Sequence, residues 1–113
     1  MLPCQFFCKM TDLGVARGDR CGFAYGINSN TQIVGSSGVC RGGVNAFLWE
    51  NGSIVNLNTL IPKNSGLHLV YAFYISDRGE IAGVGVPPGV SVYDVDAKGH
   101  AFLLIPDDDD DHH

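Results

Sequence analysis

Residues 24–35, AYGINSNTQIVG, and residues 72–83, AFYISDRGEIAG, decide the fold because they are two copies of one pattern. Matched positions are 48 residues apart throughout, as from Ala24 to Ala72. In both copies an aromatic residue, an isoleucine, a polar turn, a second isoleucine and a glycine follow in the same order. Self-similarity at such a period is typical of repeat architectures, in which each repeat is one supersecondary unit. The sequence therefore predicts two equivalent repeats.

Each of these segments is predicted to be a β-hairpin. In the first copy the turn covers residues 28–31, where Asn and Ser tolerate the left-handed conformations of tight turns. In the second copy residues 76–79 take its place, and Gly79 stands at the position of positive φ. A further hairpin surrounds Asn51 and Gly52, a pair that is the strongest short hairpin signal between apolar runs.

A second pair of blocks extends the repeat. Residues 45–48, NAFL, match residues 100–103, HAFL, at a spacing of 55, so the second copy carries seven extra residues before this block. The repeats then cover about residues 21–60 and 68–106. We expect strands at about 22–28, 32–38, 45–50 and 53–58 in the first repeat, and at about 68–76, 80–86 and 99–105 in the second.

The fourth strand of the second repeat is predicted at the opposite end of the sequence. Residues 10–14, MTDLG, match the fourth-strand residues 54–58, IVNLN, whereas Pro106 and the Asp run after it disfavour a ladder strand. We therefore expect residues 10–15 to form a displaced strand that completes the last blade. The predicted organisation is an N-terminal arm at 1–9, a single all-β domain at 10–106 and a disordered acidic and histidine-containing tail at 107–113.

Three blocks in this order resemble the extracellular HAF repeat family. The blocks are residues 11–14, residues 24–35 and residues 45–52, and the triplet His100-Ala101-Phe102 is the family's signature, with Asn45 at the matching His position of the first copy. The resemblance covers about residues 10–105. It implies a bacterial protein of the extracellular space or cell envelope, often built as a longer array. It implies no catalytic residues, because the family has none that can be transferred.

The repeat also predicts how chains assemble. Four antiparallel strands in about 45 residues are the unit of a β-propeller blade. Two blades leave outer faces bare, and the displaced strand leaves sheet edges that invite pairing with another chain. We therefore expect a cyclic homo-oligomer closed head to tail, with a trimer of about six blades favoured over a dimer or tetramer. The alternatives are a monomeric sandwich or barrel and a structural unit of a longer repeat array.

Charge and hydropathy exclude two classes of partner. The net charge is −5, but five of the twelve acidic residues form the run 107–111, which leaves seven acidic residues against seven basic ones. A body without a basic stripe predicts no nucleic-acid partner. No stretch of about 20 apolar residues is present, so no membrane insertion is expected.

Aromatic residues supply the first functional hypothesis. Tyr25, Tyr71 and Phe73 are expected to line a groove between blades, where propeller lectins stack sugars. Tyr93 and Arg41 lie in long loops at one rim, the default place for function on a rigid scaffold. These residues predict an extracellular binding module that recognises a carbohydrate, another small-molecule ligand or a surface partner, and no cofactor is expected for this role.

Histidines and aspartates supply an alternative, a small metal-assisted hydrolase of esters, lactones or glycosides. His68, His100, Asp94 and Asp96 are predicted at the same rim, where they suit metal binding or acid–base chemistry. Asp94 and Asp96 also resemble the start of a calcium loop, although Lys98 stands where a third oxygen ligand belongs. The competing interpretation makes His100 a structural repeat position and His68 a half-exposed strand residue.

Four cysteines allow three disulfide connectivities, or reduced thiols. Pairing within the first hairpin brings Cys21 and Cys40 close together at its open end, which makes a disulfide between them geometrically possible. Cys4 and Cys8 lie outside the repeat. They either pair with each other or tether the N-terminal arm, and the sequence leaves this choice open.

Overall fold

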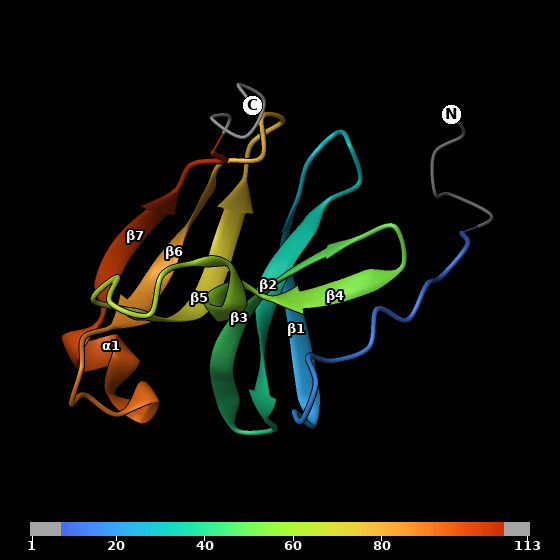
Figure 1. Cartoon of the computed structure of the whole chain (residues 1–113). Coiled ribbons are helices and arrows are strands. Elements are labelled where there is room, and N and C mark those ends of the chain that lie inside the picture. Colours follow the sequence, from blue (N-terminus) through green and yellow to red (C-terminus); the bar gives the residue numbers. More distant parts are fainter. Residues whose placement is uncertain (1–7, 108–113) are drawn as a thin grey trace.

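Two antiparallel β-sheets make up the protein (Figure 1), as seen in a computed structural model that describes residues 8–107. Sheet A contains, in order, β1 (Cys21–Ile27), β2 (Ile33–Val39), β3 (Gly42–Glu50) and β4 (Ser53–Asn56). Sheet B contains β5 (His68–Ile75), β6 (Ile81–Val86) and β7 (His100–Leu104). The short helices are η1 (Leu57–Leu60), η2 (Val92–Asp94) and α1 (Val95–Lys98). Sequential strands are neighbours and neither sheet closes into a barrel, so the all-β meander prediction is confirmed.

The two sheets share one strand register. Gly35 of β2 lies opposite Phe47 of β3, and Gly83 of β6 lies opposite Phe102 of β7. These pairs reproduce the spacings of 48 and 55 residues found in the sequence. Sheets A and B are therefore two copies of one meander, and within the described residues the second copy has its first three strands.

The tight turns show the backbone conformations that their sequences favour. Asn51 and Gly52 both have positive φ, at 52° and 83°, as expected of the hairpin turn predicted there. Gly79 has the predicted positive φ, at 85°. Its repeat equivalent, Thr31, also has a positive φ, at 59°, which is rare for a β-branched residue. Both repeats therefore have the same turn geometry, although threonine disfavours a positive φ.

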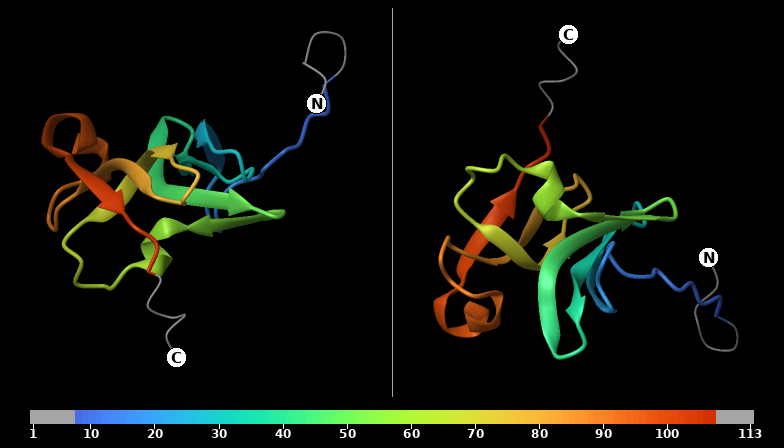
Figure 2. Two further views of the ribbon diagram at one scale, coloured as in Figure 1. Left: turned by 90° about the horizontal axis from the view of Figure 1, so that it is seen from above. Right: turned by 60° about the horizontal axis from the view of Figure 1, so that its bottom comes forward.

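Residues 10–15 do not form the predicted strand. They run along the face of sheet A that is turned away from sheet B, as Figure 2 shows. The hydroxyl of Ser36 donates to Val70 of β5, so the next side chain, Ser37, points to the opposite face, where it accepts a hydrogen bond from the Ala16 N–H. The short link to β1 keeps the segment beside sheet A and away from β7. Within residues 8–107, sheet B is therefore left with three strands.

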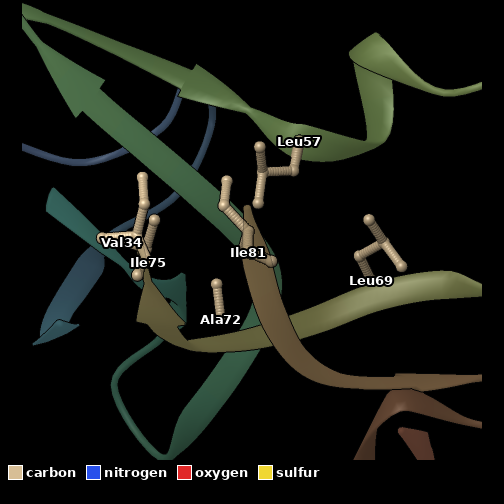
Figure 3. Packing of buried hydrophobic residues seen from close by; sticks show 7 residues of the cluster. Val34, Leu57, Leu69, Ala72, Ile75 and Ile81 are labelled. Carbon is tan, nitrogen blue, oxygen red and sulfur yellow. The ribbon is translucent and has the colours of Figure 1, made fainter. Parts of the chain in front are cut away.

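Strand β5 joins the sheets, because it packs across β1, β2 and β3 while β6 and β7 lie farther out (Figure 1). Side chains of β5 point to both sides of the strand, with register shifts at Val70 and Phe73, and each side has its own core. The larger cluster, most of which Figure 3 labels, contains Val34, Ala46, Leu57, Leu69, Ala72, Ile75 and Ile81. The smaller one contains Val70, Val86 and Val95, so α1 is anchored on the other side of β5.

The predicted disulfide between Cys21 and Cys40 is formed, with their Cα atoms 5.1 Å apart. It ties the start of β1 to the turn between β2 and β3. Cys8 is also disulfide-bonded, and no cysteine in the described part of the chain is free. Cys4, most of the predicted arm at 1–9 and most of the predicted tail at 107–113 lie outside the described residues. Across residues 8–107, no helix is long and apolar enough to cross a membrane.

Candidate functional site

Three aromatic rings meet where β1 runs beside β5. The rings of Tyr71 and Phe73 are stacked, with centroids 5.5 Å apart and planes 11° from parallel. Tyr25 is tilted against both, 5.2 Å from Phe73 and 6.0 Å from Tyr71. Tyr25 and Phe73 nevertheless remain 45 % and 46 % exposed. The structure thus brings together the three residues that the sequence predicted for a groove between blades.

A β-bulge shared by both repeats positions two of these rings. The ladder register shifts at Tyr25 in β1 and at Phe73 in β5, which are equivalent positions 48 residues apart. An extra residue in one strand of a pair re-aims its side chain and increases the local twist. Because β5 packs against β1, the two re-aimed rings become neighbours. The cluster is therefore a product of the repeat itself.

The rings form one wall of an open cleft with a volume of about 430 Å³. Its other lining residues come from β6 and from the inserted segment, namely Val84, Val95, Asp96 and Gly99. The carboxylate of Asp96 offers hydrogen-bond acceptors, while the valines extend the apolar surface. A concave, largely apolar site with a few polar groups is the usual form of a small-molecule binding site.

Hydrogen bonding and burial set the state of the two tyrosine hydroxyls. The Tyr71 hydroxyl accepts the backbone N–H of Gly43 at 3.2 Å, which ties this ring to the start of β3. Burial, and to a smaller extent the charge of an ionised Tyr71, raise the pKa of Tyr25 above its ordinary value. The Tyr25 phenol therefore stays protonated at neutral pH and can donate a hydrogen bond.

The other two predicted binding residues lie outside this cleft. Tyr93 belongs to η2 and is largely exposed, but it does not line the cavity. Arg41 lies in the turn between β2 and β3, next to the disulfide. A binding role for either residue stays a prediction, because neither lines this cleft.

The two histidines of the hydrolase hypothesis point to opposite faces of sheet B. His68 lies opposite Val86 of β6, and His100 lies opposite Gly85. Since Gly85 and Val86 are consecutive in a strand, their side-chain directions alternate, and so do those of the histidines beside them. The Nε2 atom of His68 is engaged with the carbonyl oxygen of Val44 at 2.8 Å. The histidines therefore do not converge on one substrate group.

The two aspartates are not brought together with the histidines either. Asp94 ends η2 and Asp96 lies in α1, and side chains two positions apart on a helical backbone do not face each other. The segment is instead organised around Val95, which is buried in the smaller core. In the part of the chain that the structure describes, no group of three His, Cys, Asp or Glu side chains could hold a metal. Neither the hydrolase nor the calcium hypothesis finds an assembled site there.

Sequence reasoning missed the inserted segment as a wall of the aromatic cleft. Asp96 is predicted for metal binding or acid–base chemistry, and no role is predicted for Val84, Val95 and Gly99, yet all four line the cavity. The available signal is the seven-residue insertion itself, since insertions specific to one repeat often form the binding face of a repeated scaffold. Its fold into η2 and α1 decides which of its residues face the rings.

The chain matches no family model, no curated protein and no solved structure. The resemblance to HAF repeats therefore rests on its sequence blocks, and a function has to be inferred from the site.

Proposed function

We propose that this protein is an extracellular binding module that holds a carbohydrate in the aromatic cleft. The observation that carries the proposal is the pair Tyr25 and Phe73, which remain nearly half exposed although they contact each other and Tyr71. A contiguous exposed apolar patch on a folded protein often marks a binding site. The rings also pack against one another, which limits the side-chain freedom that ligand binding would remove.

The chemistry of the cleft fits a sugar. A pyranose has apolar C–H faces and a polar rim of hydroxyl groups, and it needs a surface that offers both. The rings supply large apolar faces with negative π density, against which C–H groups pack favourably. The carboxylate of Asp96 can accept hydrogen bonds from sugar hydroxyls, and the protonated Tyr25 hydroxyl can donate one. The volume of about 430 Å³ suits one or two sugar units.

The extracellular part of the proposal is supported by the bond between Cys21 and Cys40. Structural disulfides form and persist mainly in oxidising compartments. A propeller-like architecture, which we include in the proposal, is supported by two sheets that repeat one meander, with β5 of sheet B packed across β1, β2 and β3 of sheet A. These features support the proposal of a secreted scaffold with its ligand site between neighbouring blades.

Binding of the purified protein to a glycan array and to insoluble cell-wall polysaccharides tests the proposal. We expect specific binding that falls at least about tenfold in Tyr25→Ala and in Phe73→Ala, since a lost stacking contact of about 1.4 kcal/mol corresponds to that factor. Tyr74→Ala is the matched control, because Tyr74 is an exposed tyrosine next to Phe73 that does not line the cleft. Circular dichroism of each variant confirms that it is folded.

Two results would refute the proposal. One is the absence of binding across broad arrays and polysaccharides. The other is binding that Tyr74→Ala weakens as much as Phe73→Ala does, since the ligand would then lie outside the cleft.

A further inference from the structure

Strand β7 has an outer edge without a partner strand among residues 8–107. In sheet A the equivalent edge of β3 is covered by β4, with Leu48 opposite Val55 and Phe47 opposite Asn56. The exposed edge of β7 presents unpaired backbone N–H and C=O groups, which form a template for another strand. Leu103, the repeat equivalent of Leu48, is 60 % exposed. Sheet B is thus open at the position that a fourth strand fills in sheet A.

Residues 10–14 have the local structure of that missing strand's end. In the first repeat, the Asn56 side chain accepts the N–H of Asn58 at 2.9 Å, which forms a turn at the end of β4. The Asp12 side chain accepts the N–H of Gly14 at 3.0 Å in the same way. These residues hold matching positions in IVNLN and MTDLG. The segment therefore adopts the turn of a fourth strand although it is not paired as one.

The position of residues 10–14 is the one a repeat predicts for the sheet before sheet A. In the first repeat, residues 53–56 pair with β3 and the chain then passes through η1 to β5 in the next sheet. Residues 10–14 likewise precede β1, and they lie on the face of sheet A that is turned away from sheet B. Sheet A lies between this segment and β7 of the same chain (Figure 1), so one chain cannot pair the two.

The segment is only loosely held where it lies. A cavity of about 290 Å³ remains between residues 10–14 and the residues of β1 and β3 beneath them. Met10 is almost fully exposed, and no backbone hydrogen bond from residues 10–15 to a strand is found in the described part of the chain. Moving this segment onto a new partner would therefore break few interactions.

We propose that residues 10–14 are a donated strand, which pairs with β7 of a second copy of this chain and completes that copy's sheet B. The register of β3 with β4 transfers directly, so that Thr11 lies opposite Leu103 and Met10 lies opposite Leu104. The two strands come from two copies of this chain, because residues 10–14 carry both the pattern and the side-chain turn of the repeat's own fourth strand. The contact joins different surfaces of the two chains, so it is head to tail.

Cysteine cross-linking tests both the contact and its register. One sample carries Thr11→Cys, a second carries Leu103→Cys, and the two are mixed and oxidised. We expect a covalent dimer whose linking peptide joins positions 11 and 103. Met10→Cys mixed with Leu103→Cys is the matched control, because a neighbouring strand residue points to the other face and should not cross-link. Equal cross-linking of the two mixtures, or of neither, would refute the proposal.

Light scattering on a size-exclusion column gives an independent test. The unaltered protein should elute as an oligomer at about 100 μM, and Met10→Pro with Thr11→Pro should convert it to a monomer, because proline removes the N–H groups that the ladder needs. The same variant should keep its circular dichroism spectrum, since residues 10–15 form no strand within one chain. A monomeric unaltered protein, or an oligomer that the prolines leave intact, would contradict strand donation.

Discussion

The side chain of Asn28 in the first repeat donates a hydrogen bond to the carbonyl oxygen of Ser76, its equivalent in the second repeat, at 2.8 Å. The same side chain organises its own turn, since its oxygen accepts the N–H groups of Asn30 and Gln32. A second bond between the turns runs from the Ser29 N–H to the Asp77 carboxylate, at 2.8 Å. The equivalent turns of the two repeats are therefore in direct contact, and Asn28 holds them together.

Replacing Asn28 by alanine should lower the free energy of unfolding by about 2–3 kcal/mol, because several part-buried hydrogen bonds lose a partner together. Urea denaturation followed by circular dichroism measures the loss. Asn30→Ala is the control, because the exposed Asn30 side chain makes one bond across the turns, to the Asp77 carbonyl. An equal cost for both variants would mean that Asn28 does not have this linking role.

Asp77 should make the contact between the turns sensitive to acid. Hydrogen bonds from Ser29, chiefly from its backbone N–H, hold the pKa of the Asp77 carboxyl below its ordinary value of 3.8. A carboxyl whose pKa is lower in the folded state stabilises the fold above the unfolded-state pKa, and this contribution is lost as the pH falls through the folded-state pKa. The difference in urea midpoint between the unaltered protein and Asp77→Asn should therefore shrink on acidification below about pH 4. A difference that stays constant down to pH 2 would contradict this assignment.

The repeat could be predicted from the sequence because it rests on local chemistry. Turn residues such as Gly52 and Gly79, and the alternation of apolar residues on either side, specify hairpins without any knowledge of tertiary structure. The same hairpin register was enough to place Cys21 beside Cys40. The grouping of Tyr25 with Phe73 followed from the repeat, because equivalent residues of neighbouring units lie side by side.

The remaining features depend on contacts distant in sequence. The structure does not bring His68 and His100 together, because proximity at one rim does not determine which face of a sheet each side chain occupies. The helix α1, only four residues long, is too short for its periodicity to be recognised or for it to be stable alone. Residues 10–15 carry the pattern of a fourth strand, but within residues 8–107 they are not paired with any strand, and a local pattern does not specify the pairing partner.

Replacing Thr31 by glycine, the residue type at the equivalent position of the second repeat, should make the folded protein more stable. Its φ of 59° lies in the left-handed region, which costs a non-glycine residue about 1–2 kcal/mol, whereas the equivalent residue is Gly79. After the greater chain entropy of glycine in the unfolded state is subtracted, Thr31→Gly should stabilise the protein by about 0.5–1 kcal/mol. The melting temperature measures this gain. Thr31→Ala keeps the strain and serves as the control, and a larger gain from alanine would show that the backbone is not strained here.

The disulfide between Cys21 and Cys40 should contribute about 3 kcal/mol, because it closes a loop with a sequence separation of 19 residues. The double variant Cys21→Ser with Cys40→Ser removes it specifically, which a reducing agent does not, since Cys8 is also disulfide-bonded. Urea denaturation at pH 7 measures the difference in the free energy of unfolding. A loss below about 1 kcal/mol would show that the first hairpin is already closed by its strand pairing and turn.

Gly35 and Gly83 should be the least replaceable residues of the two repeats. They are equivalent, and a Cβ atom at either would overlap a backbone carbonyl oxygen of the neighbouring strand, that of Phe23 for Gly35 and that of Tyr71 for Gly83. The overlap involves backbone, which cannot move aside as a flexible side chain can. Phe23 lies in β1 and Tyr71 in β5, the two strands whose bulges re-aim the aromatic rings of the cleft. The close approach of the glycines to these strands is therefore part of the bulged geometry.

Gly35→Ala and Gly83→Ala should therefore each cost more than about 3 kcal/mol, beyond the usual range for a single substitution. Gly42→Ala is the matched control, because a Cβ there would meet only the Tyr71 hydroxyl, at an ordinary 3.8 Å. Thermal unfolding measures all three, and any Gly83→Ala protein that does fold should bind the cleft ligand more weakly. If Gly83→Ala were as stable as Gly42→Ala, the bulge would not require this approach, and the placement of Phe73 would need another cause.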